Sequence, residues 1–141
     1  MQLGMKVNVK WIGKMGFTGE SLKTHNTIRL DTSVENHGEG LGVSPMEVVL
    51  MGLAGCSGMD VVSILRKRRV EFDQFNILIE GERASEHPKV FTNINMIFSF
   101  SGTDLKEQVL ADTIGLSINK YCSVAGMLNK SAKINWQVRI E

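Results

Sequence analysis

The chain has 141 residues, a length that predicts one domain over residues 1–141 with a hydrophobic core of its own. A formal net charge of +1 and an aromatic content of 6% give no sign of a nucleic-acid-binding protein. The N-terminal residues show no apolar segment with a cleavage site, so we expect no signal peptide, a cytoplasmic location and reduced cysteines.

Alternating apolar residues predict a β-meander over residues 5–31. Its first strand runs from Met5 to Ile12, where Val7, Val9 and Trp11 alternate with polar residues. A glycine-containing turn leads to a second strand, and a short third strand completes the meander. The glycine-rich segment that follows is expected to form an exposed loop.

A long helix is predicted over residues 44–69. Ser44 and Glu47 have the S-x-x-E spacing of a capping box, and Pro45 suits the first helical position. The basic run 66–69 lies at the predicted C-terminus, where cations offset the helix dipole. We interpret this run as a solvated helix end rather than as a contact for nucleic acid.

The middle of this helix is apolar on every side, which predicts burial on every side. It is nearly long enough to span a bilayer, but Glu47 and Asp60 would be costly in lipid, so we expect a core helix and no membrane contact. The strands of one chain cannot cover such a helix completely. We therefore expect a homodimer in which two copies of the helix pack centrally, through a stripe of small residues: Gly52, Ala54, Gly55, Cys56 and Gly58.

The second half of the chain predicts a β-hairpin over residues 71–101, helices over 104–129 and a last strand over 133–140. The hairpin strands alternate on either side of a polar turn, and apolar residues at helical spacing follow from Leu105. The order of these elements predicts a mixed α/β fold of the α+β type.

The candidate chemistry lies in two cysteines, neither of which belongs to a C-x-x-C pair. Cys56 lies in the middle of the long helix, where packing as a small hydrophobe is the alternative to a reactive thiol. An apolar pocket and the carboxylate of Asp60, one turn on, would both disfavour the thiolate of Cys56. A reactive Cys56 therefore needs a cationic or hydrogen-bonding partner from elsewhere. The histidines lie in polar segments and are interpreted as surface residues rather than metal ligands: His25, His37 and His87.

Cys122 is expected near the start of a third helix, where backbone N–H groups and the neighbouring Lys120 would favour a thiolate. A half-buried cysteine at a helix start is the alternative. Together the two thiols suit a peroxidatic and resolving pair. In such a pair a peroxide oxidises the first thiol to a sulfenic acid, and the second condenses with it to a disulfide.

Three short motifs resemble the OsmC/Ohr superfamily of organic hydroperoxide reductases, and more narrowly its small YhfA-like branch. The motifs are Ser-Pro-Met-Glu at 44–47, Leu-Ala-Gly-Cys-Ser at 53–57 and Lys-Tyr-Cys-Ser-Val at 120–124. The resemblance covers nearly the whole chain, and the separation of 66 residues between the cysteines fits the family. It implies an intertwined homodimer whose two long central helices are wrapped by antiparallel β-sheets.

The same resemblance implies a stress-response peroxidase with Cys56 as the peroxidatic and Cys122 as the resolving thiol. Its substrates would be organic hydroperoxides, including those of lipids, and a dithiol would re-reduce the enzyme without any metal or other cofactor. In a second interpretation the chain is a non-catalytic dimer that binds a small apolar ligand or acts as a redox sensor.

Two positions depart from the hydroperoxide-reductase pattern. Those enzymes have an activating arginine in the first hairpin, whereas here the hairpin carries Lys14 and no arginine, and the only early arginine is Arg29 in the third strand. Met46 stands where they have a glutamate. Glu47, nine residues before Cys56, lies about half a turn round and about 13 Å along the helix axis, out of reach of the thiol. It could assist Cys56 only from a partner subunit, and we favour its role as the helix cap.

Overall fold

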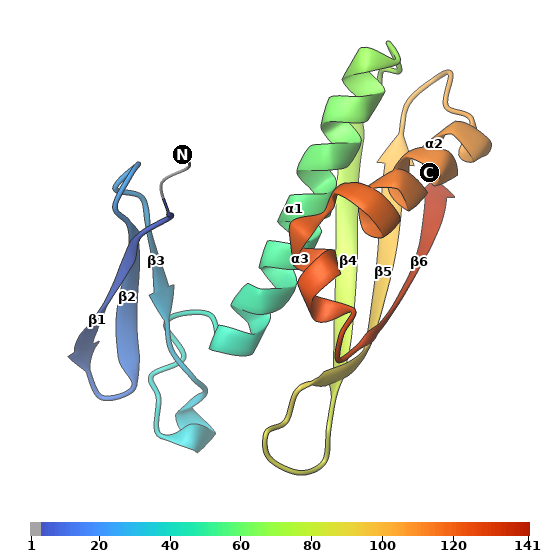
Figure 1. The fold of residues 1–141 in the computed structure, drawn as a ribbon. Coiled ribbons are helices and arrows are strands. Elements are labelled where there is room, and N and C mark those ends of the chain that lie inside the picture. Colours follow the sequence, from blue (N-terminus) through green and yellow to red (C-terminus); the bar gives the residue numbers. More distant parts are fainter. Residues whose placement is uncertain (1–3) are drawn as a thin grey trace. The chain divides into compact units, whose positions relative to one another are not determined.

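The computed structural model describes residues 4–141. The chain divides into two compact units, one that ends at Val49 and one that runs from Leu50 to Glu141. The units contain a three-stranded sheet each, and the helices accompany the second sheet (Figure 1). This is the mixed α+β class that the order of elements predicts.

The first unit is an antiparallel sheet in the order β1-β2-β3. Its strands are β1 (Val7–Gly13), β2 (Gly16–Ser21) and β3 (Thr27–Leu30), followed by the short 3-10 turn η1 (Val34–Asn36). The apolar residues of β1 that alternate in the sequence are exposed, with Val7 at 70% and Trp11 at 62% of full exposure. One face of this sheet therefore lacks the cover that an apolar face needs.

Helix α1 (Pro45–Lys67) begins with the capping box that the sequence predicts. The Ser44 N–H donates to Glu47 Oε1 over 2.8 Å, and the Glu47 N–H donates to Ser44 Oγ over 3.2 Å. Both bonds satisfy N–H groups that a helix start leaves without partners. Past its C-terminus Arg69 has a left-handed φ of 58°, and the Val70 N–H donates to the Leu65 carbonyl.

Only one stripe of α1 is buried, at i, i+4 spacing: Leu53, Ser57, Val61 and Leu65. By length and composition α1 could cross a membrane, with a mean hydropathy of 1.9, yet only 22% of that apolar window is buried. Met59, for example, is 76% exposed. The burial on every side that the sequence predicts is therefore absent from the single chain.

The second sheet has the order β4-β5-β6. Strands β4 (Gln74–Arg83) and β5 (Phe91–Ser101) are antiparallel, whereas β6 (Lys133–Ile140) runs parallel to β5. This parallel pair departs from the antiparallel sheets that the family resemblance implies. The helix-facing side chains of β5 are buried and form the centre of the core: Phe91, Ile94, Met96, Phe98 and Phe100.

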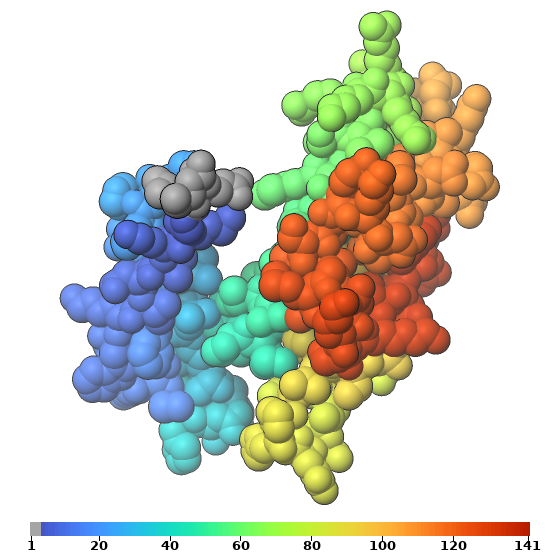
Figure 2. All heavy atoms as spheres, viewed as in Figure 1, coloured from blue at the N-terminus to red at the C-terminus, as the bar shows by residue number. Residues whose placement is uncertain are grey.

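Two further helices and a π turn complete the second unit: α2 (Glu107–Leu116), η2 (Ser117–Tyr121) and α3 (Ser123–Leu128). With α1 they cover one face of the second sheet (Figure 1), and the α2–α3 segment forms a continuous surface beside α1 (Figure 2). Helix α2 begins later than the expected residue 104, after Lys106, whose side chain makes no capping bond. The π turn has no signature in apolar periodicity and was not predicted from the sequence.

Candidate functional site

Cys56 lies halfway along α1, directly before Ser57 of the buried stripe. Its side chain is only partly buried, and it is a free thiol. The position beside a stripe residue leaves Cys56 at the edge of the core, where a small molecule could still reach the sulfur.

Cys122 is placed by the π turn. Its N–H donates to the Ser117 carbonyl over 2.7 Å, which closes the turn, and Cys122 is then the N-cap of α3. The Sγ atom accepts a hydrogen bond from the Ala125 N–H over 3.4 Å. Cys122 is 4% exposed, so access to this thiol runs through the protein rather than from solvent.

The two thiols are neighbours, although they lie 66 residues apart in the sequence. Burial raises the pKa of Cys122 to about 11, and a hydrogen bond to the Cys56 side chain and the charge of Cys56 add to the rise. The N–H groups of Ala125 and Val124 act in the opposite direction and lower this pKa, but less strongly. Cys122 is therefore a neutral thiol at neutral pH.

Of the two alternatives for Cys122, a thiolate favoured by the α3 N-terminus and Lys120 or a cysteine packed at a helix start, the raised pKa of Cys122 supports the second. The N-terminal N–H groups do act on the sulfur, but desolvation outweighs them. Lys120 lies over the neighbouring Tyr121 ring, with its Nζ 5.2 Å from the ring centroid. The sequence shows the helix start but not the depth at which it is buried.

A buried polar cluster adjoins the two cysteines. Ser117 Oγ lies 2.9 Å from Ser57 Oγ and 2.9 Å from Asp60 Oδ2, and both serines have no exposed surface. From the sequence, Asp60 is predicted only as a neighbour of Cys56, and its bond to Ser117 is not. A signal was present at Ser57, which interrupts the otherwise apolar buried stripe of α1, because a buried hydroxyl needs a partner.

A largely apolar groove of about 700 Å³ runs along α1, and Cys56 is not among the residues that line it. Most of the lining is small or apolar and comes from α1 and β4: Ala54, Gly55, Gly58, Met59, Val62, Phe75 and Ile77. The polar lining residues are Ser63, Arg66, Lys67 and Asn76. A Cβ at Gly58 would lie 3.3 Å from the end of the Ile77 side chain, a tight contact that a small shift of that side chain would relieve. The groove can take an apolar group on the same helix that carries the more accessible thiol.

Glu47 is engaged in the capping box described above. The Ser44 N–H, and after it the Ser44 hydroxyl, hold the pKa of the Glu47 carboxyl below its ordinary value. This arrangement is the helix-cap role that the sequence analysis favoured.

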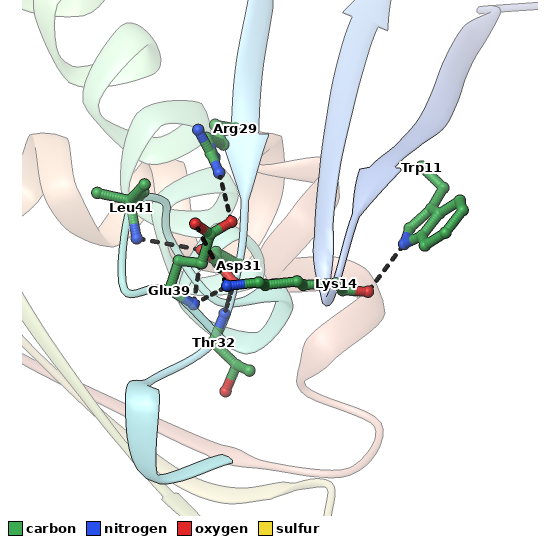
Figure 3. Close-up of polar contacts among 7 residues, drawn as sticks. All are labelled: Trp11, Lys14, Arg29, Asp31, Thr32, Glu39 and Leu41. Atoms are coloured by element: carbon green, nitrogen blue, oxygen red, sulfur yellow. Dashed lines mark hydrogen bonds and ion pairs between the residues drawn. The ribbon is translucent and has the colours of Figure 1, made fainter. Parts of the chain in front are cut away.

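The early cations Lys14 and Arg29 both approach one carboxylate in the first unit. Glu39 lies 3.5 Å from the Arg29 guanidinium and 4.0 Å from Lys14 Nζ (Figure 3). The loop that carries Glu39 is held by the buried Asp31 carboxylate, which accepts hydrogen bonds from three backbone N–H groups: those of Thr32, Glu39 and Leu41. These bonds hold the pKa of Asp31 below its ordinary value.

Within residues 4–141 no three His, Cys, Asp or Glu side chains gather as metal ligands. The three histidines are exposed, and His25 Nδ1 lies 3.0 Å from Glu20 Oε2. The thiol pair offers one accessible sulfur and one that is buried and neutral. Two such neighbouring thiols can be oxidised together to a disulfide.

Comparison with known proteins places this chain in a family. The sequence model of the family described as OsmC-like protein matches residues 37–137. Protein YhfA of Escherichia coli K12 is 41% identical over 130 residues, which cover 92% of this chain and 93% of YhfA.

Solved structures share the fold over the whole chain. A hypothetical protein from Aquifex aeolicus VF5 is 31% identical with a TM-score of 0.82, over 100% of this chain and 99% of that one. An organic hydroperoxide resistance protein OsmC from Legionella pneumophila has a TM-score of 0.71, over 100% of this chain and 98% of its own. Its identity is 12%, so this second likeness shows the fold alone.

Proposed function

The chain belongs to the OsmC-like family, and from this premise we propose that it is a thiol-dependent peroxidase that reduces organic hydroperoxides. The observation that carries the proposal is the pairing of the partly exposed Cys56 with the buried Cys122. Members of the same fold include proteins named for organic hydroperoxide resistance, which supports a role in peroxide stress.

The difference in burial between the two sulfurs supports the assignment of their roles. Cys56 is partly exposed and can meet a substrate, whereas Cys122 is 4% exposed and protonated. A thiolate, not a thiol, is the nucleophile, so the accessible Cys56 is the peroxidatic residue and Cys122 the resolving one.

The reaction has two steps at these sulfurs. The Cys56 thiolate attacks one peroxide oxygen, the O–O bond breaks, and the alkoxide leaves as an alcohol after taking a proton from water, so that Cys56 becomes a sulfenic acid. Cys122 then attacks the Cys56 sulfur, the S–O bond breaks, and the hydroxide leaves with the Cys122 proton as water. An external dithiol reduces the Cys56–Cys122 disulfide and is itself oxidised.

The active form is a homodimer in the cytoplasm. Exposed apolar side chains on α1 and on the first sheet support this, since a single chain leaves both faces uncovered. The apolar groove along α1 would then be covered by the second copy.

The test is peroxide turnover with a dithiol reductant. Wild-type protein should consume cumene hydroperoxide in the presence of dihydrolipoamide, and Cys56→Ser should remove the activity. Cys122→Ser should still reduce about one equivalent of peroxide and then stop as the sulfenic acid. A wild-type rate equal to that of Cys56→Ser would refute the proposal.

The apolar groove favours one alternative, a non-catalytic dimer that binds a small apolar ligand. Native mass spectrometry of the purified protein distinguishes the two functions. A retained apolar ligand without peroxide turnover would support the binding function.

A further inference from the structure

We propose that Ser117, held by Ser57 and Asp60, is a positioning residue that keeps Cys122 within bonding reach of Cys56. The inference rests on the proposed function, because it concerns the step in which the disulfide closes. It assigns a task to a buried cluster that the peroxidatic chemistry leaves unused.

The donors and acceptors of the cluster can be assigned by counting protons. A hydroxyl has one proton to donate, and an ionised carboxylate can only accept. Ser117 therefore donates to Asp60 Oδ2 over 2.9 Å, and the Ser57 hydroxyl donates to Ser117 Oγ over 2.9 Å. Each buried hydroxyl is satisfied, and the cluster joins α1 to the first residue of the π turn.

The backbone of Ser117 carries this link on to the second cysteine. Its carbonyl accepts the Cys122 N–H over 2.7 Å, the bond that closes the π turn. On the other side Ser57 directly follows Cys56 in α1. Ser117 thus links the segment of α1 that carries Cys56 to the backbone of Cys122 through three hydrogen bonds.

This connection matters most after Cys56 has been oxidised. The Cys122 sulfur must then attack the Cys56 sulfur, so that an S–S bond forms, the S–O bond breaks and water leaves. Reactions between held groups depend strongly on placement, and an error of about 1 Å can cost about 100-fold in rate. The Cys122 sulfur is buried and accepts a hydrogen bond from the Ala125 N–H, so its place follows from the backbone of the π turn and the α3 start.

The buried polar cluster also costs more free energy than apolar side chains of similar size would. Alanine at both serine positions would replace two buried hydroxyls by apolar groups, and buried polar groups cost free energy unless every partner is in place. If Ser117 served only for packing, removing its hydroxyl would leave the geometry of the two thiols unchanged. If Ser117 positions Cys122, removing the hydroxyl would alter that geometry.

The experiment compares Ser117→Ala with Thr113→Val. Thr113 is a matched control because it is also fully buried on α2, but its hydroxyl bonds only to the Val109 carbonyl of the same helix. After one equivalent of cumene hydroperoxide, trapping with dimedone and intact mass spectrometry should show unchanged formation of the Cys56 sulfenic acid in Ser117→Ala. Closure of the disulfide should slow by at least about tenfold in that variant and should be unchanged in Thr113→Val.

A second readout needs no peroxide. In buffers of reduced and oxidised dithiothreitol, the equilibrium constant for closing the Cys56–Cys122 disulfide should fall at least about tenfold in Ser117→Ala only. This measurement tests the positioning role of Ser117 separately from the proposed peroxidase activity, because it applies even to a protein that reduces no hydroperoxide. If Ser117→Ala does not fold, Asp60→Ala, which removes the acceptor of the Ser117 proton, should show the same loss. Closure rates and equilibria equal to wild type in a folded variant would overturn the inference.

Discussion

Cys122 is the side chain whose chemistry the fold changes most clearly. Its pKa is raised to about 11, chiefly by burial, from an ordinary thiol value near 9. A rise of about two units lowers the thiolate fraction at neutral pH by about 100-fold. A thiol that stays neutral reacts slowly with peroxide, which suits a resolving cysteine that attacks only the oxidised Cys56 sulfur.

Alkylation should therefore discriminate between the two cysteines. At pH 8 we expect iodoacetamide to modify Cys56 at least about tenfold faster than Cys122, because Cys122 has both little thiolate and little exposure. Peptide mass spectrometry over time measures both rates, and urea-unfolded protein is the control in which they should converge. Equal rates in the folded protein would contradict the burial of Cys122.

The raised pKa of Cys122 also predicts a pH dependence of stability. Between about pH 9 and 11 the unfolded chain loses the Cys122 proton while the folded chain keeps it, so the free energy of unfolding should fall as pH rises. Urea unfolding at several pH values measures this slope. In Cys122→Ala the slope over this range should be smaller, and an unchanged slope would show that other groups cause it.

At the level of single residues the sequence was informative about identity but not about environment. The two cysteines and the Ser44–Glu47 box could be singled out because their spacing carries meaning. The neutral state of Cys122 and the bond from Ser117 to Asp60 could not, since both depend on the depth at which distant segments meet.

The capping box at the N-terminus of α1 stabilises this helix through local hydrogen bonds. Ser44→Ala removes the oxygen that accepts the Glu47 N–H and should destabilise the protein by about 1 kcal/mol in urea unfolding. Glu47→Gln keeps an acceptor for the Ser44 N–H and should change stability less. Peroxide turnover per folded molecule should be unchanged in both variants, and a large loss in Glu47→Gln alone would assign this carboxylate to the reaction.

The loop after β3 depends on one carboxylate. Asp31 is 2% exposed, and the backbone N–H groups of Thr32 and Leu41 are the leading causes of its lowered pKa. Its contribution is therefore present above the unfolded pKa and is lost as pH falls through the folded value. Hydrogen exchange at Leu41 should accelerate in Asp31→Asn near neutral pH, while exchange in β4 stays unchanged.

Most strands and helices could be predicted from the periodicity of apolar residues, with some exceptions. Strands and the long helix were visible because apolar residues repeat with their geometry. The π turn, the parallel pairing of β6 with β5 and the late start of α2 were not. Each of these depends on tertiary packing rather than on a pattern within the segment.

At the scale of the whole molecule, the single chain leaves apolar surface of α1 and of the first sheet exposed. The apolar window of α1 is only 22% buried, and the first sheet exposes the side chains that alternate along β1. Exposed apolar patches of this extent mark association surfaces. The homodimer expected from the sequence remains our proposal for what covers them.

Met59 offers the sharpest test, since it is 76% exposed on α1 and lines the apolar groove. We expect wild-type protein to elute with about twice the chain mass of 15.6 kDa in light scattering, and Met59→Glu to shift toward the monomer because a buried charge opposes association. Leu78→Glu is the matched control: this residue of β4 is 53% exposed, and its neighbours Ile77 and Ile79 point to the helix-covered face. A dimer that survives Met59→Glu but dissociates in Leu78→Glu would move the interface from α1 to the outer face of the second sheet. The apolar groove along α1 would then stay open to solvent, without cover from a second copy.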